Sequence, residues 1–113
     1  MASKQVQLTD ETIEVVARRF RLLGEPVRLR LLQLLEADER TVNELVEALQ
    51  GNQPNISRHL NALFDGGLVK RRRDGISIYY SVADPVVFKL CELVCKSARE
   101  QVRVQLTAFD AQI

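Results

Sequence analysis

The feature that most constrains this chain is a pair of short helix patterns that run directly into a hairpin signal. Thr41, with Glu44 three residues later, forms a capping box that opens a helix with Leu45 and Leu49 on one face. Gly51-Asn52 interrupts that helix. A second helix is predicted from Gln53-Pro54 to Gly66-Gly67, because proline is tolerated in a first turn and apolar residues recur at helical spacing at Ile56, Leu60, Leu63 and Phe64. The segment therefore predicts a helix-turn-helix.

A hairpin signal follows the second helix at once. Two β-prone runs, Leu68 to Arg73 and Ile76 to Val82, flank Asp74-Gly75. Asp-Gly between such runs is a strong hairpin signal, since a type I′ turn needs a positive φ at both central positions. The first strand carries consecutive basic residues from Lys70 to Arg73 toward the tip. We therefore predict a two-stranded hairpin with a strongly basic first strand.

The polar face of the second predicted helix carries side chains suited to nucleic acid. Amides, a hydroxyl and a guanidinium can reach base edges and phosphates in a major groove. Taken singly, these features have plainer explanations, because charge runs are commonly solvated faces and helix-turn-helix patterns occur by chance. Together and in this order within residues 41–82, they predict DNA binding. The candidate DNA-binding residues are Gln53, Asn55, Ser57, Arg58, His59, Asn61, Arg71, Arg72 and Arg73.

The chain resembles the ArsR/SmtB family of winged-helix transcriptional repressors over nearly its whole length. The resemblance is carried by L-G-E-P-V-R-L-R-L-L-Q-L-L (23–35), T-V-N-E-L-V-E-A-L (41–49), Q-P-N-I-S-R-H-L-N-A-L (53–63) and G-G-L-V-K-R-R-R-D-G-I-S-I-Y-Y-S-V (66–82). The S-R-H-L element followed by G-L-V and a tyrosine-bearing strand is its most specific part. The resemblance implies a homodimer on a palindromic operator that leaves the DNA when an effector binds or a thiol is modified.

Length and charge agree with this interpretation. A chain of 113 residues predicts one domain over 1–113. With the resemblance, this implies a single winged-helix domain whose N- and C-terminal helices form the dimer interface. The formal net charge is only +1, and four of the sixteen Lys and Arg residues stand at 70–73. We therefore expect phosphate affinity to concentrate on this basic strand and Arg58. Without a signal peptide or an apolar run of membrane-spanning length, we expect a soluble, cytoplasmic protein with no membrane partner.

Three further helices complete a mainly α (α+β) fold of about five helices and one two-stranded hairpin. Thr9 or Asp10 caps the first, which runs to about Leu23 with Ile13, Val16, Ala17 and Phe20 on one face. The second runs from Pro26 to about Ala37 and is leucine-rich, which predicts a buried centre that includes Leu29, Leu31, Leu32, Leu34 and Leu35. Asp84, just before Pro85, opens the last helix, which runs to about Thr107.

The last predicted helix has two apolar stripes, which a lone surface helix does not need. The first is Val86, Leu90, Leu93 and Val94. The second follows alternating steps of three and four residues and consists of Phe88, Cys91, Cys95, Ala98, Val102 and Phe109. We interpret the second stripe as a dimer seam, because two recognition helices must be held about 34 Å apart to enter successive major grooves.

Both cysteines lie in this seam, and two interpretations stay open. Reduced cysteine is often a small buried hydrophobe, so Cys91 and Cys95 can be packing residues. Alternatively, two thiols at i, i+4 share one helix face, and a two-fold axis brings two more, a set that suits a soft ion such as Zn(II) or, with three thiolates, arsenite. A disulfide within the helix is disfavoured, because the Cβ atoms at this spacing stand about 5 to 6 Å apart.

The chain departs from the best-known sensor patterns of the family it resembles. Arsenical sensors carry Cys-x-Cys where Thr41 and Asn43 stand, and persulfide or peroxide sensors use a second-helix cysteine that is absent around Gln33 and Leu34. Zinc sensors use Asp and His pairs in the last helix; Asp84 fits one position, but the partner positions hold Val86, Ser97 and Glu100. The effector therefore stays open.

Three functional hypotheses follow from the sequence, and none is an enzyme. A single histidine and the lack of a glycine-rich phosphate loop or an evident carboxylate pair argue against catalysis. The first hypothesis is a repressor gated by a soft metal, a metalloid or a redox signal at Cys91 and Cys95. The others are a constitutive winged-helix dimer without a small effector, and a dimeric protein-interaction module. The polar face of the second helix favours DNA over a protein partner.

Overall fold

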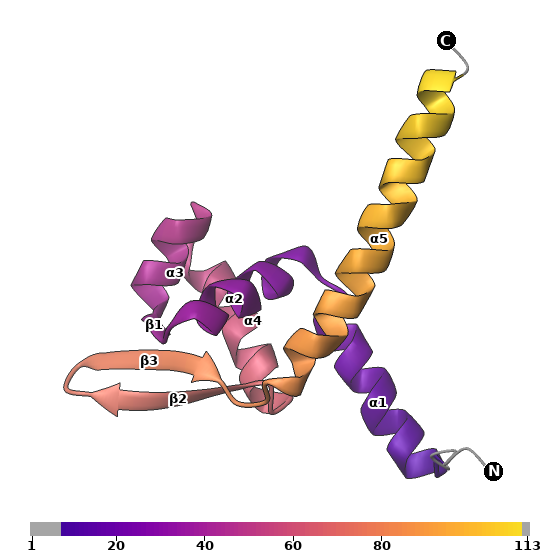
Figure 1. Cartoon of the computed structure of the whole chain (residues 1–113). Helices are drawn as coiled ribbons and strands as arrows, with labels where there is room; N and C mark the ends of the chain where they lie inside the picture. The colour runs from indigo at the N-terminus through magenta and orange to yellow at the C-terminus, as the bar shows by residue number, and fades with distance from the viewer. Residues whose placement is uncertain (1–7, 112–113) are drawn as a thin grey trace. The chain divides into compact units, whose positions relative to one another are not determined.

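The computed structural model describes the backbone of residues 8–111 and the side chains of residues 8–108. Within this part, the five helices and the hairpin predicted from the sequence are present, together with one additional strand (Figure 1). The chain divides into two compact units between Ala83 and Asp84, and each unit is described by itself. The single domain over 1–113 stays a prediction. The elements of the first unit are α1 (Asp10–Leu23), α2 (Pro26–Ala37), β1 (Arg40–Thr41), α3 (Val42–Leu49), α4 (Gln53–Asp65), β2 (Val69–Asp74) and β3 (Ser77–Val82).

The helices of the first unit begin where side-chain caps satisfy their first backbone N–H groups. Thr9 Oγ1 accepts the N–H of Thr12 at 3.2 Å. At the start of α3 the capping box is complete, since Thr41 Oγ1 accepts the N–H of Glu44 at 3.2 Å and Glu44 Oε1 accepts the N–H of Thr41 at 3.0 Å. The helix bounds predicted from Thr9, Pro26, Thr41 and Gln53-Pro54 are confirmed.

The sheet has three antiparallel strands in the order β1-β3-β2. The predicted two-stranded hairpin is confirmed as β2–β3, and β1 adds a third strand that the sequence did not predict. In the added pairing, Arg40 lies opposite Tyr80 and Thr41 opposite Tyr79. A strand of two residues has no alternating pattern of its own. It forms because β3 offers it an unpaired edge, and it ties the hairpin to the start of α3 (Figure 1).

The hairpin turn lies one residue later than the sequence predicts. Asp74 pairs with Ser77, which leaves Gly75 and Ile76 as the two loop residues. Gly75 has φ 62°, whereas Ile76 is not among the described residues with positive φ. The type I′ turn centred on Asp74-Gly75 is therefore wrong, and glycine at the first loop position fits a type II′ turn.

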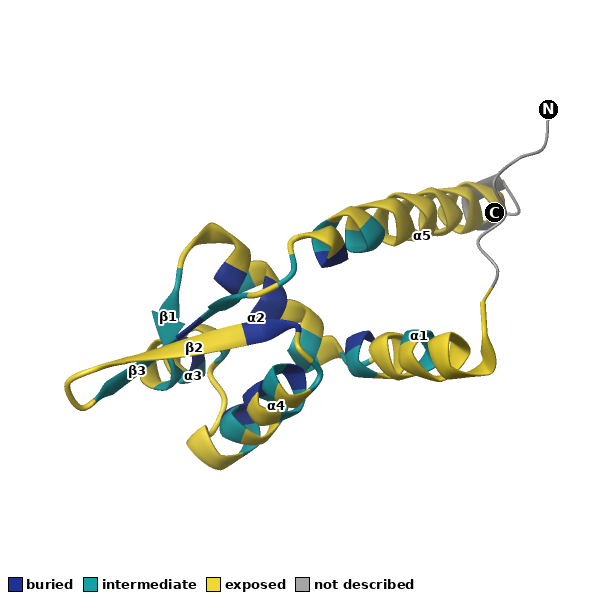
Figure 2. Ribbon diagram, turned by 90° about the horizontal axis from the view of Figure 1, so that it is seen from below, coloured by how far each residue is buried: buried dark blue, intermediate teal, exposed yellow. Residues whose placement is uncertain are grey.

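The core of the first unit is formed by one apolar face from each of its inner elements. Its buried residues are Leu23, Leu31, Leu32, Leu35, Leu45, Ile56, Leu60, Leu63, Leu68, Val69 and Tyr80. The prediction that α2 forms a buried centre holds for Leu31, Leu32 and Leu35, but Leu34 is half-buried and Leu29 is 42% exposed. On the predicted apolar face of α1, Ile13 and Phe20 are exposed, Val16 and Ala17 are half-buried, and only Leu23 is buried (Figure 2).

The second unit is built on α5 (Val86–Ala111), which extends beyond the predicted end at Thr107. Asp84 Oδ1 accepts the N–H of Val86 at 3.0 Å, as expected of a residue that opens the helix. The side chain of Phe109, assigned to the predicted seam, lies outside the described side chains. In the described part of the chain, no helix has the length and apolarity to cross a membrane.

Candidate nucleic-acid interface

Helix α4 is held in the first unit by its apolar face and by a side-chain cap. Ile56, Leu60 and Leu63 are at most 1% exposed, and the helix packs against α2, α3 and β2. Asn52 Oδ1 accepts the N–H of Asn55 at 2.9 Å. These contacts fix the rotation of α4 about its axis, which determines the residues that it turns outward (Figure 2).

The outward face of α4 is polar, as the sequence predicts. Gln53, Arg58 and Asn61 are exposed, while Asn55 and Ser57 are half-buried. Gln53 Nε2 donates to Ser57 Oγ at 3.3 Å, so these two side chains form a small hydrogen-bonded pair on the first turns. Amide and hydroxyl groups presented on one exposed helix face can reach the donor and acceptor pattern of base edges.

His59, also proposed from the sequence as a DNA-binding residue, is engaged within the first unit. Its Nδ1 accepts a hydrogen bond from Arg28 Nε at 3.1 Å, and it lies 3.8 Å from Glu25 Oε2. The side chain is only 15% exposed. Glu25 in turn accepts the N–H of Arg28 at 3.1 Å. His59 therefore joins α4 to the start of α2, an arrangement that its sequence position alone did not reveal.

The three arginines of β2 have different surroundings. Arg71 pairs across the sheet with the buried Tyr80, and its guanidinium stacks on the ring of Phe64 at 4.0 Å from the centroid. Because Phe64 belongs to α4, this cation–π contact joins the basic strand to the helix that carries the polar face. The basic strand is therefore held against α4 at Phe64.

Arg72 is ion-paired with Glu39, which lies just before β1. Arg72 Nε donates to Glu39 Oε2 at 2.9 Å, and Nη2 donates to Oε1. The guanidinium also lies 4.6 Å from the centroid of the Tyr79 ring. The hydrogen bonds from Arg72, and after them its charge, lower the pKa of Glu39 from the usual 4.5, and Glu39 raises the pKa of Arg72. Glu39 and Arg72 are 33 positions apart, so no local sequence pattern predicts this ion pair.

Lys70 and Arg73 are the least restrained cations of the basic strand. Both are exposed, and neither makes an ion pair with any residue in the described part of the chain. Lys70 lies opposite Ser81 and Arg73 opposite Ile78, so neither faces an acidic residue across the ladder. These two side chains can neutralise phosphate without first breaking an internal ion pair.

The two thiols lie on α5. Cys91 is half-buried and Cys95 is exposed, and neither is in a disulfide. Among the described residues there is no group of three or more His, Cys, Asp or Glu side chains that could hold a metal ion. The chain by itself therefore offers a soft ion at most the pair of thiols on this helix face.

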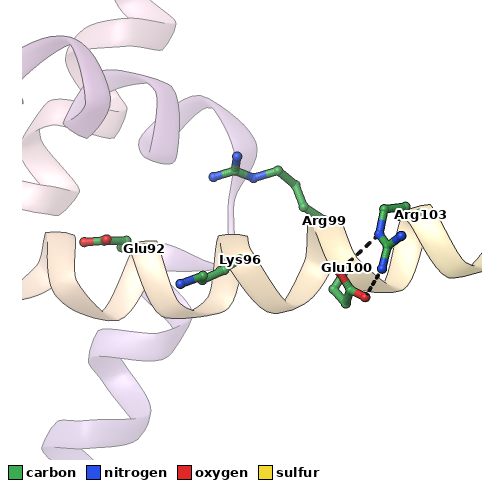
Figure 3. Close-up of a pocket in the computed structure, with 5 residues that line it drawn as sticks. All are labelled: Glu92, Lys96, Arg99, Glu100 and Arg103. Carbon is green, nitrogen blue, oxygen red and sulfur yellow. Dashed lines mark hydrogen bonds and ion pairs between the residues drawn. The ribbon is translucent and has the colours of Figure 1, made fainter.

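From Glu92 to Ala108, helix α5 is exposed all round and has two chemically distinct faces. One is charged and shallowly hollowed, lined by Glu92, Lys96, Arg99, Glu100 and Arg103, with an ion pair between Glu100 and Arg103 (Figure 3). Away from this face, the apolar residues Val94 and Val102 are 57% and 53% exposed. The stripe residues beyond Cys91 are thus uncovered in one chain, whereas Phe88, Leu90 and Cys91 are half-buried.

Comparison with known proteins finds similarity to transcriptional regulators. Residues 25–71 match the sequence profile described as "Bacterial regulatory protein, arsR family". A probable mercury resistance operon repressor of Streptomyces lividans is 48% identical over 80 residues, covering 71% of this chain and 64% of its own length. The chain thus spans less than two thirds of that relative. An uncharacterized HTH-type transcriptional regulator of Methanocaldococcus jannaschii is 38% identical over 85 residues, covering 74% of this chain and 96% of its own length.

A solved structure extends the similarity to the fold. The homodimeric winged helix-turn-helix DNA-binding domain Mb0332 of Mycobacterium bovis, described as a possible ArsR-family transcriptional regulator, superimposes with a TM-score of 0.74. It is 37% identical, with 88% of this chain and 92% of that chain covered. The matching profile and the similar fold are those of winged helix-turn-helix DNA-binding regulators rather than of enzymes. The chain belongs to the ArsR family of bacterial transcriptional regulators.

Proposed function

We propose that this chain is a homodimeric transcriptional repressor that binds a palindromic operator through α4 and the β2–β3 hairpin, the wing. The observation that carries the proposal is the outward polar face of α4, which packs against a basic strand whose Lys70 and Arg73 make no ion pair with any described residue. The Streptomyces lividans relative is named as a repressor and the Mycobacterium bovis domain as a homodimer, which supports both parts of the proposal.

The side chains divide by chemistry into base readers and phosphate binders. We assign base readout to the amide and hydroxyl groups of Gln53, Asn55, Ser57 and Asn61, and phosphate contacts to Arg58, Lys70, Arg71 and Arg73. Of the other DNA-binding candidates, we assign His59 to the placement of α4, because it hydrogen-bonds to Arg28, and we leave Arg72 out of the phosphate binders, because it is paired with Glu39.

An operator selected from a randomised DNA library tests this assignment. Asn55→Ala keeps the backbone N–H that Asn52 caps, so α4 should form normally. The preference for the operator over mixed-sequence DNA should fall by about tenfold, the order expected for one lost base contact. The matched control is Asn43→Ala, at an exposed position on α3, which should leave the preference for the operator unchanged. If the wild-type chain shows no affinity for any duplex, a protein-interaction module becomes the better description.

Dimerisation is proposed from the uncovered apolar surface. The apolar side of α5 and Ile13 and Phe20 of α1 are exposed in one chain, and a second copy would remove them from water. The same pairing would set the distance between two copies of α4, which must be about one DNA turn for a palindrome.

For the effector, we propose a soft ion bound through Cys91 and Cys95. Thiolates select soft ions, two thiols at i, i+4 share one helix face, and the mate of a dimer would supply two more. The mercury-related name of the Streptomyces lividans relative makes Hg(II) the first ion to test, before arsenite and Zn(II). A redox signal at the same thiols, and a regulator without a small effector, are the alternatives.

Operator affinity of the fully reduced protein, with and without Hg(II), arsenite, Zn(II), peroxide or a persulfide donor, distinguishes these alternatives. The Cys91→Ser, Cys95→Ser double variant should fold, dimerise and bind the operator, but it should not respond to the effector that releases the wild-type protein. If no reagent changes the affinity of the wild-type protein, the cysteines are packing residues and the signal acts elsewhere.

A further inference from the structure

The ion pair between Glu39 and Arg72 spans the sheet from one edge to the other. Arg72 lies opposite Tyr79 on the central strand, and Tyr79 also lies opposite Thr41. Because side chains alternate between sheet faces, Arg72, Tyr79 and Thr41 share one face. Glu39, two residues before Thr41, reaches Arg72 over the Tyr79 ring. An acid outside the hairpin therefore holds the middle arginine of the wing.

The contact uses the N–H groups that Arg72 would otherwise offer to DNA. Nε and Nη2 of Arg72 donate side by side to the two carboxylate oxygens of Glu39. A phosphate group is recognised by the same guanidinium fork with the same two parallel bonds. Glu39 and a DNA phosphate therefore compete for Nε and Nη2 of Arg72, while the remaining Nη1 lies 3.9 Å from Asp74 Oδ2 on the same strand. Arg73 has no such competitor among the described residues.

We propose that Glu39 withholds Arg72 from the DNA backbone and thereby sets the affinity of the wing. The inference rests on the proposed DNA-binding function and adds to it an acidic positioning residue that lies outside the DNA-binding elements. Arg72 contributes no net phosphate contact while Glu39 is ionised. Removal of the Glu39 charge converts Arg72 into an additional phosphate-binding residue.

The pair is exposed enough for this conversion to occur without unfolding the wing. The side chains of Arg72 and Glu39 are 53% and 34% exposed, and exposed pairs contribute little to stability. The wing is also held by the full β2–β3 ladder from Val69–Val82 to Asp74–Ser77. We therefore expect Glu39→Gln to leave the fold intact, which thermal unfolding can check.

A double-mutant cycle on a mixed-sequence DNA duplex, followed by fluorescence anisotropy over a range of salt concentrations, tests the proposal. Glu39→Gln should tighten binding roughly two- to fivefold at low salt, as expected for one freed surface ion pair. It should also steepen the slope of log affinity against log salt by about 0.9 unit, the value for one more phosphate contact. In an Arg72→Ala background, Glu39→Gln should change neither quantity. Glu36→Gln is the matched control, because it removes an exposed acid three residues away.

Each alternative outcome has a different meaning. Equal effects of Glu39→Gln with and without Arg72, or an equal effect of Glu36→Gln, would reveal general charge repulsion and overturn the proposal. Weaker binding by Glu39→Gln would also overturn it, since Glu39 would then help the wing to bind. If the wild-type chain binds no duplex, the proposed function fails together with this inference; if it binds but Glu39→Gln has no effect, only the inference fails.

Discussion

The three wing arginines should contribute unequally to DNA binding, and the comparison of Arg73→Ala with Arg72→Ala measures the difference. Both substitutions remove one positive charge from adjacent positions of β2, so each is the control for the other. Arg73 is exposed with no ion pair in the described structure, whereas Arg72 is paired with Glu39. A simple count of charges predicts that both substitutions lower the affinity for DNA equally, whereas the structure predicts that only Arg73→Ala lowers it.

The expected magnitude follows from counterion release. Each phosphate contact contributes about 0.9 to the slope of log affinity against log salt. A rise from about 50 to about 200 mM salt should therefore weaken the contribution of one contact about 3.5-fold. Arg73→Ala should lower the slope by this 0.9 unit, and its affinity deficit should shrink as salt rises. Arg72→Ala should leave the slope unchanged.

The assay is fluorescence anisotropy with a labelled mixed-sequence duplex, because phosphate contacts are independent of base sequence. Arg71→Ala is measured in the same series and should lower the slope of log affinity against log salt as much as Arg73→Ala does. It should in addition lose affinity at all salt concentrations, because its stacking on Phe64 orders the wing against α4. The reasoning is refuted if Arg72→Ala lowers the slope as much as Arg73→Ala.

Two further substitutions test the dimer seam and the backbone. Ala98→Glu places a charge on the apolar side of α5 and should yield monomers in sedimentation, since an unpaired charge in an apolar interface costs several kcal/mol. The control is Thr107→Glu, which places the same charge on the charged side of the helix. An intact Ala98→Glu dimer would exclude this seam. Gln50 has φ 51° and ψ 38° after α3, so Gln50→Gly should raise the free energy of unfolding by about 0.5 kcal/mol. In urea titrations Glu47→Gly, within α3, should instead lower it by about 1 kcal/mol, and a lower stability for Gln50→Gly would contradict the strain argument.

Helix bounds could be predicted because their determinants are local. Thr41 and Glu44 are one helical turn apart, and Pro26 and Pro54 restrict the backbone next to the helix starts that they mark. The two-residue strand β1 could not be predicted, because its residues have no pattern apart from the edge of β3 that they join. The predicted turn register was wrong by one residue. Asp74-Gly75 fits the residue preference of a type I′ turn, but the strand pairing makes Gly75 and Ile76 the two loop residues.

The candidate site could be predicted as a set of residue types but not as a set of contacts. The polar face of α4 follows from helical periodicity. The contacts that give His59 and Arg72 their partners join positions 31 and 33 residues apart. Such pairs depend on how α2, α4 and the sheet pack together, which neither periodicity nor composition encodes.

The basic run of the wing therefore overstates the charge that is available to DNA. Four consecutive cations stand at 70–73 in a chain whose net charge is only +1. One of them, Arg72, is neutralised by an acid across the sheet, and another, Arg71, is oriented by an aromatic ring of α4. Once β1 is paired with β3, Glu39, the residue just before β1, lies within hydrogen-bonding distance of Arg72. The residue two positions before the capping threonine thus decides, by its charge, how many wing cations can meet the phosphate backbone.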